Sequence, residues 1–197
     1  MGNASGSWAS PWLLHKEPVH LFVAGLSKSG KNSILRTMKM KPPFYTTVQP
    51  AVKVHQQRNI SAYSITIDDS GVLPSCQLYL KPNLAGLIFV IDSSADESTQ
   101  NVAVFHALLE ACPKNIPILI LANKQDIKGA IRADEVINTL ELANLSPEVH
   151  SWLVQPCCAF DEENLYEGLS WLSSGAPISE QARAYTKRFR TTKSAMK

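Results

Sequence analysis

The sequence has no apolar run long enough to cross a membrane. Its longest run, residues 84 to 91, contains a glycine and is far shorter than the roughly 20 residues that a membrane-spanning helix needs. Residues 1 to 7 also lack the apolar core of a secretory signal. We therefore expect a chain that folds in an aqueous compartment.

Cysteine is scarce, and its spacing excludes small domains that are held together by disulfides or by zinc. The four cysteines are Cys76, Cys112, Cys157 and Cys158. They fit neither a disulfide framework nor the paired spacing of a zinc site, which favours a reducing cytoplasm. A chain of 197 residues can form one domain without such staples.

Acidic residues are almost missing from the C-terminal segment, residues 176 to 197. This segment holds six Lys or Arg and one acid, Glu180, so its charge is +5, whereas the whole chain carries +2. We expect a separate basic tail. It is either a solvated terminus or a segment attracted to an anionic membrane or an acidic partner.

A glycine-rich turn at residues 25 to 33 carries the clearest chemical signal. It reads Gly25-Leu26-Ser27-Lys28-Ser29-Gly30-Lys31-Asn32-Ser33 and separates an apolar strand from a helix. In this setting backbone N–H groups point at a phosphate and the lysine reaches the outer phosphates. The pattern asks for Ser or Thr after the lysine to bind magnesium, and here Asn32 stands instead. The motif therefore predicts phosphate binding and only weak metal binding.

The pattern of the remaining chain predicts an α/β domain. We expect strands at residues 19–24, 51–55, 60–67, 87–92, 117–122 and 152–157, with helices from 31 to about 39 and near 96–111, 132–143 and 163–173. Segments 41–50 and 68–83 contain prolines and are expected to be loops. Alternating strands and helices indicate a mostly parallel sheet covered on both faces, with ligands at the carboxyl ends of its strands.

A second motif, Asn123-Lys124-Gln125-Asp126, follows the apolar strand at 117–122. Guanine presents a ring N–H beside an exocyclic amine, and the carboxylate of Asp126 can accept from both, whereas adenine lacks that amine. Lys124 can lie along the base, and Asn123 can bind the base edge and brace the loop. The motif therefore predicts guanine as the base.

These motifs together resemble the ADP-ribosylation factor (Arf) and Arf-like branch of the small GTPases. The matching segments are Gly25-Leu26 through Gly30-Lys31, Asn59-Ile60-Ser61, residues 86–93, Asn123-Lys124-Gln125-Asp126 and residues 165–172. They span residues 18 to 174. The resemblance implies a Ras-like P-loop domain with a six-stranded mostly parallel sheet, one antiparallel hairpin strand and helices on both faces.

The same resemblance implies which residues hold GDP or GTP. Residues 28 to 33 would contact phosphates, Asn123, Lys124 and Asp126 would hold guanine, and Cys158-Ala159 would add a backbone contact to the base. Gly25 begins the phosphate loop. Exchange-factor and effector proteins would be the partners of a monomeric protein that binds no nucleic acid.

The segments that drive hydrolysis in this family depart from its pattern. Thr47 falls where a threonine should bind magnesium, but the residues after it differ. Alignment without gaps places Thr66 at the magnesium aspartate, whereas a literal motif search places Asp68 there. Either register leaves Ser70 or Val72 in place of the catalytic glutamine. We therefore predict weak magnesium affinity, with Asn32 and Thr47 as the metal ligands that remain, and negligible intrinsic GTP hydrolysis.

The N-terminal segment, residues 1 to 17, carries signals for membrane contact. Gly2 stands where an N-myristoyl chain is attached, and Trp8 and Trp12 suit a membrane interface. One myristoyl chain gives marginal binding, so a second signal would be needed. Alternatively, the tryptophans pack on the domain's own surface.

We accordingly predict an N-terminal membrane-interacting segment (1–17), an Arf-like domain (18–175) and a basic tail (176–197). The leading hypothesis is a cytoplasmic, peripherally membrane-associated protein that recruits partners in vesicle trafficking when it binds guanine nucleotide. A nucleotide-free scaffold is the alternative, because its catalytic residues are substituted. A small-substrate P-loop kinase is a third, disfavoured by the guanine motif and by the lack of an arginine-rich lid.

Overall fold

A seven-stranded mixed sheet forms the centre of the protein. The computed structural model describes residues 12, 17–45, 52–67, 84–146, 149–176, 180, 182 and 183. The strands are β1 (Val19–Ala24), β2 (Phe44–Tyr45), β3 (Val52–Gln57), β4 (Ile60–Ile65), β5 (Leu84–Asp92), β6 (Ile118–Asn123) and β7 (Trp152–Pro156). Their order across the sheet is β2-β3-β4-β1-β5-β6-β7.

The pairing of the strands confirms the predicted Ras-like sheet. Strands β4, β1, β5, β6 and β7 are parallel, and β3 joins β4 as an antiparallel hairpin. The hairpin turns at Arg58, whose φ of 53° is left-handed. Two-residue β2 adds an antiparallel pair at the edge, within a segment expected to be loop only.

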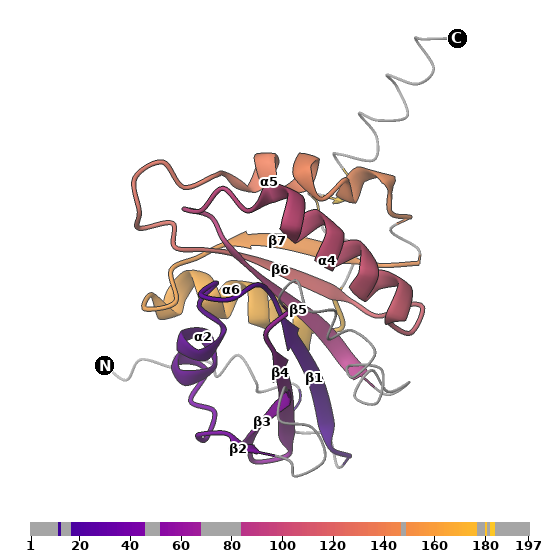
Figure 1. The fold of residues 1–197 in the computed structure, drawn as a ribbon. Helices are drawn as coiled ribbons and strands as arrows, with labels where there is room; N and C mark the ends of the chain where they lie inside the picture. Colours follow the sequence, from indigo (N-terminus) through magenta and orange to yellow (C-terminus); the bar gives the residue numbers. More distant parts are fainter. Residues whose placement is uncertain are drawn as a thin grey trace, which may run out of the picture.

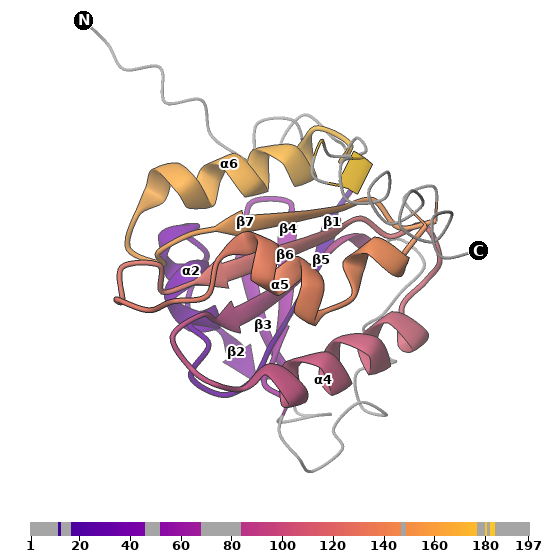
Figure 2. The ribbon, with the colours of Figure 1, turned by 90° about the horizontal axis from the view of Figure 1, so that it is seen from above.

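Helices cover both faces of the sheet, as predicted (Figures 1 and 2). The helices are α2 (Lys31–Thr37), α4 (Ser98–Ala111), α5 (Ala133–Thr139) and α6 (Glu162–Ser173), with a 3₁₀ turn at Leu142–Asn144. Helices α4 and α5 lie on one face, and α2 and α6 lie on the other. The helix expected over 132–143 ends early because Glu141 adopts a left-handed φ of 54°.

Each face has its own apolar core. Phe22 of β1 packs with Phe105 of α4 on one side, whereas Val23 packs with Leu35 and Leu169 on the other. Side chains alternate across a strand, so β1 contributes to both clusters. This explains why β5 and most of β6 are continuous apolar runs in the sequence.

Residues outside the predicted domain also join these cores. Trp12 is 6% exposed and packs in the α2–α6 cluster, and its carbonyl accepts a hydrogen bond from Asn59 Nδ2 at 2.9 Å. The burial of Trp12 agrees with the alternative interpretation, in which the tryptophans pack on the domain itself. Trp8 lies outside the described residues. Ala182 is fully buried in the α4–α5 cluster, although the tail was expected to begin at residue 176.

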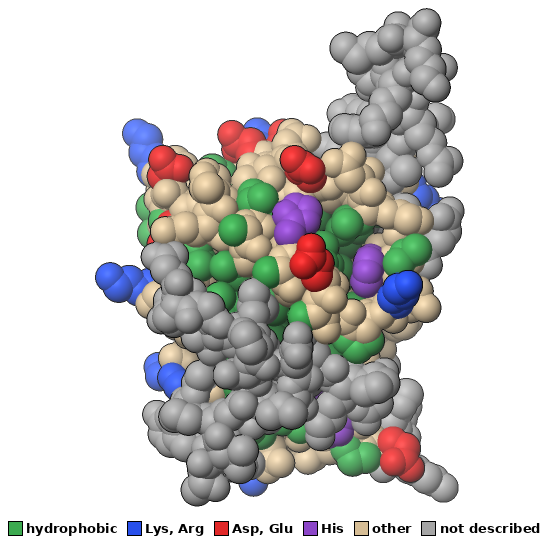
Figure 3. All heavy atoms as spheres, turned by 45° about the vertical axis from the view of Figure 1, so that its right-hand side comes forward, with side chains coloured by type: hydrophobic (Ala, Val, Ile, Leu, Met, Phe, Trp, Pro, Cys, Tyr) green, Lys and Arg blue, Asp and Glu red, His purple; other side chains and the backbone are tan. Residues whose placement is uncertain are grey.

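The surface in Figure 3 has acidic, basic and histidine side chains scattered among apolar ones. Among the described residues, no helix is long and apolar enough to cross a membrane.

Candidate functional site

The glycine-rich turn lies between the end of β1 and the start of α2, at the carboxyl edge of the sheet (Figure 1). Its chain path requires two glycines. A Cβ on Gly25 would lie 2.3 Å from the carbonyl oxygen of Val90, and one on Gly30 would lie 2.1 Å from Asn123 Nδ2. Gly30 also has a left-handed φ of 102°. Glycine is needed at both positions because another backbone or side chain approaches closely.

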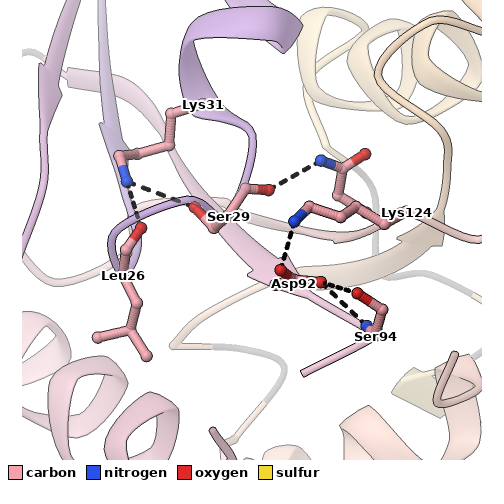
Figure 4. A network of polar contacts seen from close by, with 7 residues as sticks. Leu26, Ser29, Lys31, Asp92, Ser94 and Lys124 are labelled. Atoms are coloured by element: carbon pink, nitrogen blue, oxygen red, sulfur yellow. Dashed lines mark hydrogen bonds and ion pairs between the residues drawn. The ribbon is translucent and has the colours of Figure 1, made fainter. Parts of the chain in front are cut away.

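Lys31 lies inside this turn (Figure 4). Its side-chain nitrogen donates to the carbonyl oxygens of Gly25 and Leu26, at 2.9 and 2.6 Å, and to Ser29 Oγ at 3.3 Å. Burial, and then the positive charge of Lys53, lower the pKa of Lys31 to about 8, against an opposing effect of Glu97. The lysine is therefore fixed in the loop, at the position from which a phosphate would be contacted.

The second motif lies directly beside the first. Asn123 is 1% exposed at the end of β6, and its Nδ2 donates to the carbonyl oxygen of Ser29 at 2.8 Å. These two residues are 94 positions apart in the chain. The parallel order of β1, β5 and β6 brings their carboxyl ends to one edge, where the two motifs meet.

Asp92 at the end of β5 orients the lysine of the second motif. Lys124 Nζ lies 2.5 Å from Asp92 Oδ2, while Asp92 Oδ1 accepts from the backbone N–H and Oγ of Ser94 at 3.0 and 2.6 Å (Figure 4). Burial alone would raise the pKa of Asp92, but the hydrogen bonds from Lys124 and Ser94 lower it. Lys124 itself has a left-handed φ of 68°.

The loop after β7 completes the arrangement. Gln125 N–H donates to the carbonyl oxygen of Cys157 at 3.1 Å, which joins this loop to the second motif. Ala159 is buried, and its carbonyl accepts from Thr37 Oγ1 at 2.5 Å. Cys158 is half-buried and Asp126 is exposed, so the carboxylate is accessible to a ligand.

The structure therefore brings most of the sequence-predicted residues to one edge of the sheet. In the phosphate loop, Ser29 is buried, Ser33 is half-buried, and Lys28 and Asn32 are exposed. Gly2, Thr47 and Asp68 lie outside the described residues. Thr66 is exposed just after β4, where the next residue, Ile67, donates its N–H to the carbonyl oxygen of Gly25 at 3.2 Å.

Sequence reasoning missed two contributors to the site. Asp92 lies in the matching segment 86–93 and was assigned no role, although its place at the end of a strand was a signal for one. Lys53 of β3 gave no signal in the sequence, because only the tertiary structure brings it near Lys31.

Among the described residues, the surroundings of Asn32 do not favour magnesium. Asn32 lines a cavity together with the cationic side chains Arg36, Lys41 and Lys53, and none of the residues lining that cavity is a carboxylate. Magnesium prefers carboxylate, hydroxyl and water oxygens in a tight octahedron. Across the described residues, no group of three or more His, Cys, Asp or Glu could hold a metal.

The chain matches the model of a known family. Residues 8–176 match the model of the ADP-ribosylation factor family. The match contains both motifs, the whole sheet and Trp12, and it ends where the basic tail begins.

Proposed function

Because the chain belongs to the ADP-ribosylation factor family of small GTP-binding proteins, we propose that it is a guanine-nucleotide-dependent recruitment switch in membrane trafficking. In this proposal, GDP or GTP binds across residues 25–33 and the loops after β6 and β7. Effector and exchange-factor proteins then distinguish the two nucleotide states. The protein works in the cytoplasm, at a membrane surface.

The observation that carries the proposal is the hydrogen bond from Asn123 Nδ2 to the carbonyl oxygen of Ser29. It holds a candidate base-binding loop against a candidate phosphate loop. A nucleotide has both parts, so a ligand that occupies one loop would extend into the other.

Within this site, each side chain has a specific role. Lys31 and the backbone N–H groups of residues 28 to 33 bind phosphate oxygens. Asp126 accepts the ring N–H and the amine of guanine, and Lys124, held by Asp92, lies along the base. Cys158-Ala159 supplies a backbone contact that the hydrogen bond from Thr37 to Ala159 helps to position.

Hydrolysis is weak in this proposal. GTP hydrolysis in this class depends on positioning the attacking water and on stabilising the charge that develops on phosphate. Asn32 replaces the magnesium-binding hydroxyl, and Ser70 or Val72 replaces the water-positioning glutamine. The nucleotide state would therefore be changed by exchange rather than by turnover.

Nucleotide content and affinity test the proposal. Protein purified without added nucleotide is denatured, and the released bases are identified by chromatography. Binding of GDP and GTP is then titrated for the wild type, for Asp126→Asn and for the control Lys128→Gln. We expect Asp126→Asn to lose at least about 10-fold in affinity, since a charged hydrogen-bond acceptor is removed, and Lys128→Gln to bind normally. Equal affinity for ATP would contradict the assignment of guanine.

One observation favours the alternative, a nucleotide-free scaffold. The side-chain amine of Lys31 is already satisfied by Gly25, Leu26 and Ser29 of its own loop, so the loop can be stable without phosphate. No released nucleotide, together with no binding in the titration, would favour the scaffold.

Membrane attachment through Gly2 is a separate part of the proposal. Gly2→Ala should move the protein into the soluble fraction of a cell lysate, because it removes the acylation site. Since the basic tail could compensate, the same measurement is made with a tail deletion. Unchanged membrane association in the combined variant would exclude both signals.

A further inference from the structure

A cavity of about 220 Å³ lies beside the phosphate loop, between α2 and β3. The residues that line it are Asn32, Arg36, Met40, Lys41, Pro42, Pro43, Lys53 and His55. Asn32 and Arg36 are four residues apart and lie on one side of α2, and Met40 follows the end of this helix. Lys53 and His55 are two residues apart and lie on one face of β3.

The cavity is positively charged. Arg36, Lys41 and Lys53 contribute three cations, and none of its lining residues is acidic. His55 adds a polar but neutral wall, because burial lowers its pKa. A hydrogen bond with the backbone of Lys41 opposes part of this lowering, and the charge of Lys53 adds a smaller lowering. Its Nε2 lies 3.0 Å from Ser64 Oγ. Such a cavity attracts an anion and repels a metal cation.

The cavity adjoins the candidate phosphate loop at Asn32. Asn32, in its lining, directly follows Lys31 and occupies the position of the magnesium-binding residue in the P-loop pattern. Lys53 is close enough to Lys31 for its charge to contribute to the lowered pKa of that lysine. Asn32 of α2 and Lys53 of β3 therefore line one cavity beside the lysine that is proposed to bind the outer phosphates of a nucleotide.

From this geometry we propose that Lys53, assisted by Arg36, binds the outermost phosphate of a guanine nucleoside triphosphate and supplies the positive charge that magnesium supplies at P-loops with a Ser or Thr after the lysine. This inference rests on the proposed function. Its consequence is that the triphosphate binds without a divalent cation. The lysine N–H groups donate to phosphate oxygens, and no bond is broken.

Calorimetric titration with a non-hydrolysable GTP analogue tests this role, in EDTA and in millimolar magnesium. For the wild type, we expect affinities in the two buffers that agree within about threefold, since the charge is supplied by the protein. In EDTA, Lys53→Gln should bind the GTP analogue about 10-fold more weakly than the wild type, because one charge-assisted hydrogen bond is removed. Lys53→Glu should lose more affinity than Lys53→Gln in EDTA. It should recover part of that affinity in magnesium, because the new carboxylate can bind the metal.

Lys39→Gln is the matched control. Lys39 is exposed at the end of α2 and does not line the cavity, so this variant removes the same charge elsewhere. Circular dichroism and thermal unfolding of each variant establish that it is folded.

The outcomes separate the two proposals. Binding that requires magnesium in the wild type, or a Lys53→Gln affinity equal to that of Lys39→Gln, overturns the role of Lys53 and leaves nucleotide binding intact. Absence of binding in both buffers overturns the proposed function and this phosphate subsite with it.

Discussion

At the scale of single residues, the site is a set of buried polar groups that hold one another in place. Lys31 is bound by its own loop, Asn123 by the carbonyl of Ser29, and Lys124 by Asp92. Buried polar groups are costly unless they are paired. Each of these contacts therefore has a measurable effect on stability as well as a proposed effect on binding.

Lys31 makes stability depend on pH in the alkaline range. Its pKa is about 8 in the folded protein against 10.5 for the ordinary side chain, so the unfolded chain binds more protons between these values. Stability from this group therefore rises as pH increases from about 8 to 10.5. Between pH 7.5 and 9.5, we expect wild type to gain about 2 kcal/mol in free energy of unfolding relative to Lys31→Met.

Urea unfolding of both proteins at the two pH values measures this gain. Taking the difference between the variants removes the contribution of groups that they share. A difference that stays constant with pH would show that Lys31 keeps its ordinary pKa in the fold.

The contact between Asp92 and Lys124 should contribute more to stability than an exposed ion pair. The Asp92 side chain is 9% exposed, whereas the partners in the Arg132–Asp134 pair are 82% and 55% exposed. We expect Asp92→Asn to lower the free energy of unfolding by about 2 kcal/mol, and Asp134→Asn to change it by less than about 0.5 kcal/mol. Chemical denaturation at pH 7 compares the two.

The depressed pKa of Asp92 fixes the pH dependence of that effect. The stabilisation is fully present above the ordinary carboxyl pKa of 3.8 and is lost as pH falls through the lower folded value. Equal effects of the two substitutions at pH 7 would contradict the assigned role of Asp92.

At the scale of elements, α6 connects the base-binding loop to the core. Asp161 is its N-cap and accepts from the backbone N–H of Glu163 at 3.0 Å, directly after the loop that contains Cys158 and Ala159. Leu165 and Leu169 of α6 are fully buried on the α2 side. The start of this helix therefore fixes the loop that is proposed to meet guanine.

Asp161→Ala should destabilise the protein by about 1 kcal/mol, because an N-cap acceptor is lost. Glu162→Ala is the control, since Glu162 is also an acid in the first turn but is not the cap. Thermal unfolding compares the two variants. If the loss is equal in both, the effect comes from the charge near the helix terminus and not from the cap.

Sequence patterns predicted these elements with different success. Strands β1, β5 and β6 were predictable because both of their faces are buried, which makes each a continuous apolar run. Strand β2 was not, because Phe44 and Tyr45 follow two prolines and form a strand only through pairing with Lys53 and Val54 of β3. Likewise, motif spacing predicted that Asn123 and Lys31 share a site, but the approach of Lys53 depends on tertiary structure.

At the scale of the whole molecule, the apolar core includes a residue beyond the family match. The match ends at residue 176, yet Ala182 is fully buried among residues of the α4–α5 cluster. Ala176, in contrast, belongs to the α2–α6 cluster on the other face. A tail boundary at residue 176, drawn from charge alone, would leave the contact of Ala182 outside the domain.

Two truncations test this boundary. Deletion of residues 184–197 should leave the free energy of unfolding nearly unchanged, whereas deletion of residues 177–197 should lower it by at least about 1 kcal/mol, because apolar surface in the α4–α5 cluster becomes exposed. Both deletions remove most of the basic tail. Equal stability of the two truncated proteins would place the end of the domain at residue 176.

The position of β1 at the centre of the sheet has a consequence for biosynthesis. Its six residues leave the ribosome first among the strands, but its partners β4 and β5 are complete only at residues 65 and 92. Contacts so distant in sequence close slowly, and unpaired apolar strands aggregate. The nascent chain must therefore keep this largely buried strand from other chains until almost half of the protein has been made.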